Sequence, residues 1–162
     1  MNEILALIPA IGVLAVLASA SYHDLRERTI PIYLVGMIYI LIPVYLVLAG
    51  KDMTVGTVCF GFTFIAFIAV WGISKQQFGL GDVLILSALG WMIADLALLK
   101  AYLVVLGVLS IPYAIFCIWY YKGNAKFQKK YSKDPYLYPY MPLIFITTML
   151  YILIPSIFIS IF

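Results

Sequence analysis

The sequence predicts an all-α, polytopic membrane protein with six transmembrane helices, on the basis of its composition and its regularly spaced apolar stretches. Hydrophobic residues make up 65% of the 162 residues and charged residues only 10%, whereas about 25% of the residues of soluble domains are charged. Apolar stretches of about 20 residues, enough to cross the hydrocarbon core of a bilayer as a helix, recur along the chain. Six such spans leave too few residues for an additional soluble domain, so residues 1–162 are expected to form a single transmembrane domain.

The six spans are expected at the apolar stretches between charged segments. In order, they cover about residues 3–22, 31–49, 54–73, 82–99, 101–121 and 140–161. Asp24 closes the first stretch, and Asp82 opens the fourth. The segment Met1-Asn2-Glu3 lacks the basic residues that begin a signal peptide, so the first span is expected to stay attached.

The fourth and fifth spans need a turn between them. From Val83 to Tyr121 the apolar run is interrupted only by Asp95 and Lys100. At about 1.5 Å per residue, a single helix over this run would be nearly twice as long as a hydrocarbon core of about 30 Å is thick. The turn is therefore expected near Asp95 to Lys100, and the fourth span ends as early as Ala94 if Asp95 already lies at the interface.

The basic residues predict how the spans are oriented. Eight of the ten follow the first, third and fifth spans: Arg26, Arg28, Lys75, Lys122, Lys126, Lys129, Lys130 and Lys133. Lys51 and Lys100 fall on the other side. Because Lys and Arg are enriched in cytoplasmic loops, we expect a multi-pass cell-membrane protein whose Asp24 and Asp82 both face the cytoplasm. The basic loop before the sixth span is expected to set topology or to meet membrane lipid, and no nucleic acid is expected as a partner.

Asp24 and Asp82 are the candidate catalytic residues. An ionisable side chain at the edge of the hydrocarbon is costly unless it is paired or hydrated, so two of them at one face indicate a functional site. Gly79 and Gly81 precede Asp82, and glycine permits positive φ or a close approach of another chain segment. The alternatives are structural. Asp82 could cap its helix, and Asp24 could be an interface residue paired with Arg26 or Arg28.

The other reactive residues favour carboxylate catalysis without a metal or another cofactor. His23 is the only histidine, which excludes a multi-histidine zinc site, and the Gly-x-Ser-x-Gly motif of serine hydrolases is absent. Cys59 and Cys117 lie in separate spans and are expected to be packing residues. Two neighbouring carboxyl groups cannot easily both ionise, so one keeps a proton while the other acts as a base toward water. Which of the two is the base stays open, because such a pair titrates as a unit.

Two segments of the chain resemble the prepilin peptidases, a family of membrane aspartyl proteases. They are Asp24-Leu25-Arg26-Glu27-Arg28-Thr29-Ile30-Pro31 and Gly79-Leu80-Gly81-Asp82, the second of which matches the family's Gly-x-Gly-Asp motif. Pro139-Tyr140-Met141-Pro142 is similar to the Pro-rich opening of the family's last span. The chain departs from many members at Ile32, where they have Asn. It looks like the short form, similar to archaeal preflagellin peptidases and Tad-type prepilin peptidases, and it lacks the cysteine-rich zinc segment of the larger members.

The resemblance implies an endopeptidase that removes the short basic leader of pilin-like or archaellin precursors at the cytoplasmic face of the membrane. It implies Asp24 and Asp82 as catalytic residues, with Gly79, Gly81, Arg26, Pro31 and Pro142 in supporting positions. No cofactor is implied.

Two other functions stay open. A presenilin-like intramembrane protease would be expected to have Tyr-Asp deep in a span and a Pro-Ala-Leu segment, whereas this chain has Tyr22-His23-Asp24 at an interface and no such segment. The non-enzymatic alternative is a small proton- or ion-coupled transporter, or a subunit for pilus or archaellum assembly. Transport would place acidic residues near the midplane at a repeat interface, and no internal repeat is evident.

Overall fold

The computed structural model describes residues 2–27, 29–73, 79–122 and 139–154, and this part of the chain is all-helical. Its helices are α1 (Asn2–Glu27), α2 (Ile32–Leu48), α3 (Met53–Ile73), α4 (Leu80–Ile93), α5 (Leu96–Lys122) and α7 (Met141–Leu153). The prediction of an all-α protein is confirmed for these residues. Each of the six apolar stretches singled out from the sequence overlaps one of these helices, although α5 already begins within the predicted fourth stretch.

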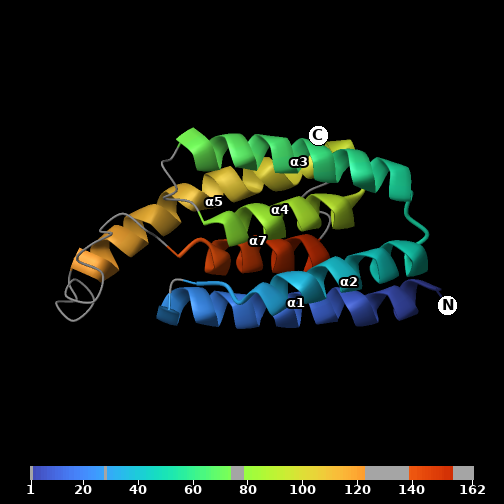
Figure 1. Ribbon diagram of the computed structural model, residues 1–162, viewed down its shortest axis with the longest axis horizontal. Coiled ribbons are helices and arrows are strands. Elements are labelled where there is room, and N and C mark those ends of the chain that lie inside the picture. Colours follow the sequence, from blue (N-terminus) through green and yellow to red (C-terminus); the bar gives the residue numbers. More distant parts are fainter. Residues whose placement is uncertain (1, 28, 74–78, 123–138, 155–162) are drawn as a thin grey trace.

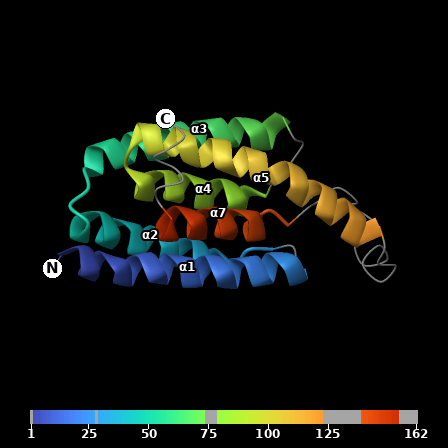
Figure 2. The same ribbon diagram turned by 180° about the vertical axis from the view of Figure 1, so that it is seen from behind.

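The helices pack side by side in a bundle, in which α1 to α5 alternate in direction (Figure 1; Figure 2). α1 packs on α2 and α7, α2 also packs on α4, and α3 makes its largest contact with α4. α4 therefore lies between α2 and α3, and most of its side chains are buried. The C-terminal end of α1 and the starts of α4 and α7 lie at the same end of the bundle, at the left of Figure 1.

The contact between α3 and α4 is close because glycines lie on both sides of it. A Cβ atom on Gly90 of α4 would lie 2.5 Å from Thr63 Oγ1 and 3.0 Å from the Cys59 carbonyl oxygen of α3. A Cβ atom on Gly56 of α3 would lie 2.7 Å from the nearest ring atom of Trp91. Small residues let helix backbones approach closely in membranes. This contact fixes the position of α4 against α3.

α4 ends in a left-handed residue, and α5 begins almost at once. Ala94 has a φ of 46°, and its N–H donates to the Gly90 carbonyl oxygen at 3.4 Å. Asp95 then caps α5, because its Oδ1 accepts hydrogen bonds from the Ala97 and Leu98 amides at 2.8 and 3.0 Å. Helix α4 therefore ends at Ile93, so the predicted bound near residue 99 is wrong and the helix end lies close to the shorter alternative at Ala94. The physical reason is that Asp95 satisfies the first amides of a new helix.

The turn between α2 and α3 lies at the opposite end of the bundle from Asp24. Lys51 Nζ donates to the Ile93 carbonyl oxygen at 2.6 Å, which ties this turn to the end of α4. Burial lowers the pKa of Lys51. Asp52 caps α3 by accepting hydrogen bonds from the Thr54 and Val55 amides at 2.7 and 3.4 Å, and these bonds lower the pKa of the Asp52 carboxyl.

Three helices in the described part of the chain are long and apolar enough to cross a membrane. They cover Ile4–Glu27, Met53–Ile73 and Leu96–Tyr120. Three further helices, Ile32–Leu48, Leu80–Ile93 and Met141–Leu153, are apolar but shorter. Length and composition therefore identify three spans, where the sequence predicted six.

Some sequence predictions concern residues outside those that the structure describes. The predicted sixth span continues beyond residue 154 into such residues. Most of the basic residues that predict the orientation also lie outside the described ranges: Arg28, Lys75, Lys126, Lys129, Lys130 and Lys133.

Candidate active site

Asp24 lies near the end of α1, where its side chain is buried and only 8% exposed. Its Oδ2 accepts a hydrogen bond from the Met141 backbone N–H at 3.0 Å. Met141 is the first residue of α7. Amides in the first turn of a helix have no partner within the helix, and this end of the helix favours negative charge. The carboxyl group of Asp24 therefore meets the positive end of α7.

Asp82 lies in the first turn of α4 and is also buried, at 6% exposed. Its Oδ2 accepts a hydrogen bond from the Gly79 backbone N–H at 3.2 Å, as the helix-capping alternative predicts. Its Oδ1 is buried and has no hydrogen-bond partner among the residues that the structure describes. Burying a carboxyl oxygen without a partner is costly. Capping therefore accounts for one oxygen of Asp82 and leaves the other without a structural role.

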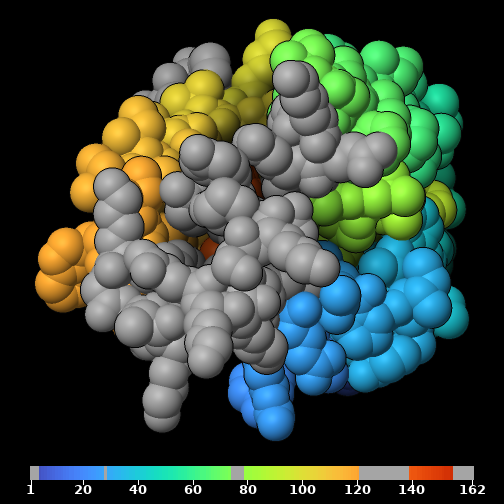
Figure 3. All heavy atoms as spheres, turned by 60° about the vertical axis from the view of Figure 1, so that its left-hand side comes forward, coloured from blue at the N-terminus to red at the C-terminus, as the bar shows by residue number. Residues whose placement is uncertain are grey.

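The two aspartates lie at the same end of the bundle although they come from different helices. The Asp82 carboxyl is affected first by its burial and second by the charge of Asp24. Viewed toward this end, α1, α3, α4 and α5 lie around the molecule, and a small part of α7 is visible between them (Figure 3). Two coupled carboxyl groups cannot easily both ionise. The arrangement therefore favours one protonated and one ionised aspartate.

Gly81 allows the connection between α1 and α2 to approach α4 closely. A Cβ atom on Gly81 would lie 3.0 Å from Ile30 Cδ1 and 3.2 Å from Ile30 Cβ. Pro31, the next residue, is the N-cap of α2. Gly79 has a φ of −69°, and Gly50 is the glycine with positive φ in the described residues. Of the two alternatives, close approach therefore explains Gly81, and neither Gly79 nor Gly81 has positive φ.

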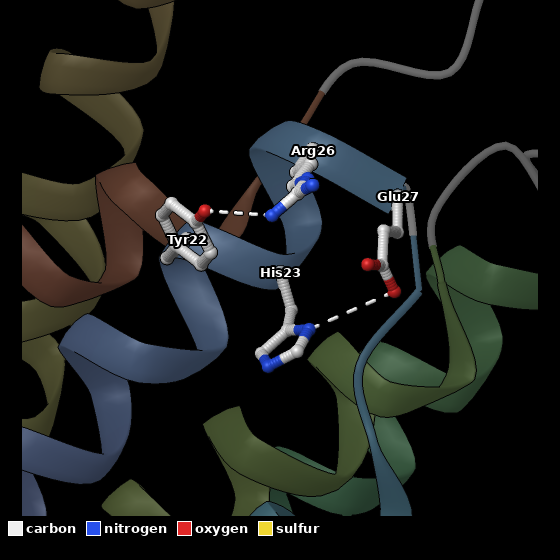
Figure 4. A network of polar contacts seen from close by, with 4 residues as sticks. All are labelled: Tyr22, His23, Arg26 and Glu27. Atoms are coloured by element: carbon white, nitrogen blue, oxygen red, sulfur yellow. Dashed lines mark hydrogen bonds and ion pairs between the residues drawn. The ribbon is translucent and has the colours of Figure 1, made fainter.

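The last turns of α1 carry a polar cluster of Tyr22, His23, Arg26 and Glu27 (Figure 4). Arg26 Nη1 donates to the Tyr22 hydroxyl at 2.9 Å, and its guanidinium lies 6.0 Å from the centre of the Tyr22 ring. His23 Nδ1 lies 3.7 Å from Glu27 Oε2. Arg26 is thus tied to Tyr22, and its support of Asp24 stays a prediction.

The start of α7 contributes groups to this end of the bundle that were not predicted from the sequence. Met141 acts through its backbone amide, which no sequence pattern reveals. Tyr140 is the half-buried N-cap residue of α7. Pro142 lies in the first turn of α7, where its missing N–H costs no hydrogen bond, so it supports the start of this helix.

The described residues contain no group of three or more His, Cys, Asp or Glu that could hold a metal ion. Cys59 and Cys117 are both buried. No protein-family model, curated protein or solved structure matches this chain. The case for a function therefore rests on the residues and the geometry of the aspartate pair.

Proposed function

We propose that this chain is a membrane aspartyl endopeptidase that removes the short leader of pilin-like or archaellin precursors. The observation that carries the proposal is the pair of buried, electrostatically coupled carboxyl groups at one end of an apolar helical bundle. Burying an ionisable group in an apolar protein costs free energy, so such groups usually have a functional role. The chain's resemblance to the prepilin peptidases supports the same chemistry.

The surroundings of the two carboxyl groups support different roles for them. The Met141 amide and the positive end of α7 favour the ionised form of Asp24. One oxygen of Asp82 is occupied by the Gly79 amide, and the other, without a partner in the described residues, is suited to carry a proton. Asp24 is therefore the base of the proposed reaction, and Asp82 is the acid.

The reaction would then follow from these two roles. Asp24 takes a proton from a water molecule while the water oxygen attacks the scissile carbonyl carbon. Asp82 gives its proton to the carbonyl oxygen, so a neutral tetrahedral intermediate forms. When the C–N bond breaks, Asp24 passes its proton to the leaving amine, and the intermediate returns a hydroxyl proton to Asp82. Both aspartates end in their starting states.

The proposed enzyme is a multi-pass protein of the cell membrane in which all six described helices span. α4 has 14 residues, or about 21 Å of helix, less than the roughly 30 Å of a hydrocarbon core. It nevertheless lies between α2 and α3, and a short span can be accommodated by local thinning of the bilayer. The basic residues near the ends of α1, α3 and α5 support a cytoplasmic position for the aspartate pair.

The test is to incubate the purified protein with candidate precursors and to map any cut by mass spectrometry. We expect a single cut on the cytoplasmic side of the hydrophobic segment of a precursor. A purified protein that is folded and inserted but leaves every such precursor intact would contradict the proposal. That result would favour the transporter or assembly-subunit alternative.

A further inference from the structure

Helix α7 packs on both α1 and α5, and its first residue reaches the aspartate pair. The Met141 N–H donates to Asp24 Oδ2 at 3.0 Å, so α7 meets this carboxyl group through its backbone. A backbone amide is placed by the chain on either side of it, and a hydrogen bond weakens when its distance or angle changes. The contact with Asp24 therefore depends on how residues 139–144 are held.

The helix holds this segment from its C-terminal side. Among the residues of the first turn of α7, Pro142 has no N–H to donate. The Leu143 and Ile144 amides donate to the Tyr140 carbonyl oxygen at 3.1 and 3.2 Å. The Met141 amide is the one in this turn that donates to another helix.

Tyr113 of α5 holds the segment from its N-terminal side. Its hydroxyl donates to the carbonyl oxygen of the buried Pro139 at 2.6 Å. Because peptide bonds are planar, only the φ and ψ of Tyr140 lie between this carbonyl group and the Met141 amide. These angles are −87° and −25°, and the cap of α7 fixes them. Anchoring the Pro139 carbonyl therefore also anchors the Met141 amide.

We propose that Tyr113 is a positioning residue of the aspartate pair, which holds the start of α7 so that the Met141 amide binds the Asp24 carboxylate. This inference rests on the proposed function. A hydrogen bond to the ionised form of a carboxyl group favours that form. The anchor on α5 thus keeps Asp24 able to act as the base.

The other charged groups near Asp24 are reached by different contacts. α2 and α7, which pack on α1, contain no Asp, Glu, Lys, Arg or His. Asp82 of α4 lies at the same end of the bundle. The contacts within α1 join His23 to Glu27 and Arg26 to Tyr22. None of these contacts involves Tyr113, so a change at Tyr113 acts on Asp24 through the start of α7.

The test compares the pH dependence of precursor cleavage in Tyr113→Phe and in the wild type. The change removes the hydroxyl and keeps the ring. With a weaker bond from the Met141 amide, Asp24 takes up a proton more readily. The limb at which activity is lost on lowering the pH should therefore move up by about one pH unit. Above this limb the cleavage rate should return to near that of the wild type, which general damage to the fold would not allow.

Tyr102→Phe is the matched control, because it also removes a tyrosine hydroxyl that joins α5 to α7. The Tyr102 hydroxyl lies 3.0 Å from Thr148 Oγ1, about two helical turns beyond Met141. This variant should leave the limb in place. A wild-type limb in Tyr113→Phe, or an equal shift in Tyr102→Phe, would overturn the role of Tyr113 while cleavage by the wild type upholds the peptidase. Absence of cleavage by the folded wild type would overturn both.

Discussion

At the scale of the residue, the two aspartates differ in what surrounds them. Asp24 is bound by an amide at the start of α7, whereas Asp82 keeps one buried oxygen without a partner in the described residues. This asymmetry could not be predicted from the sequence, because the decisive donor is a backbone amide of residue 141. The shared end of the bundle was expected, because Asp24 closes the first apolar stretch and Asp82 opens the fourth, whereas the burial of the two side chains was not predicted.

Gly81 provides a prediction at the same scale. Gly81→Val should lower precursor cleavage by about tenfold to a hundredfold, because the new side chain would collide with Ile30 and displace the start of α4 with Asp82. Leu80→Val is the control, since Leu80 is exposed and tolerates a smaller side chain. The measurement is the initial cleavage rate of protein with wild-type insertion. Equal rates in the two variants would show that the close approach at Gly81 has no functional consequence.

At the scale of the element, α4 is the helix on which the site depends. Its sequence alone suggested a longer span, because the run from Val83 to Tyr121 is apolar almost throughout. Helix α4 ends at Ile93, because Ala94 adopts a left-handed conformation that turns the chain and Asp95 caps the next helix. Capping by Asp leaves a local sequence signal, whereas a left-handed alanine leaves none. The helices and a turn near Asp95 were therefore predictable, whereas the left-handed backbone of Ala94 was not.

The packing of α4 provides a second prediction. Gly90→Ala should destabilise the protein by about 1–3 kcal/mol, because the added methyl group would lie 2.5 Å from Thr63 Oγ1 and 3.0 Å from a backbone oxygen of α3. Gly61→Ala on α3 is the matched control, since nothing lies within 4 Å of its Cβ position. Thermal unfolding in detergent measures the difference. A Gly90→Ala variant as stable as Gly61→Ala would contradict the close packing of α3 and α4.

At the scale of the whole molecule, the aspartate pair must face the cytoplasm for the proposed enzyme to cut the leader of a precursor there. The two ends of the bundle differ in sequence, because the loops at the Asp24 end hold most of the basic residues. The number of spans is harder to predict. Three helices satisfy the length criterion, while α2, α4 and α7 are shorter and would cross only as parts of the bundle. Hydropathy records apolar residues and does not distinguish burial against protein from contact with lipid.

Cysteine labelling tests this orientation. With Cys59 and Cys117 replaced by alanine, cysteines introduced at Asp52 and Lys126 should react from opposite sides of the membrane. Asp52 is exposed in the turn between α2 and α3, at the end away from the aspartates. A membrane-impermeant reagent applied to intact cells should label position 52 and not position 126. Labelling of both from one side would refute the proposed topology.

The central claim is that Asp24 and Asp82 act as one catalytic unit, and the most direct measurement is precursor cleavage by Asp24→Asn, Asp82→Asn and the double variant. Asn keeps the shape and hydrogen-bonding ability of Asp but cannot serve as its base or acid. Each single variant should insert normally and lose at least about a thousandfold in cleavage rate. The double variant should be little worse than either, because residues that share one catalytic step are not additive. Near-normal cleavage by either single variant, with normal insertion, would contradict the account.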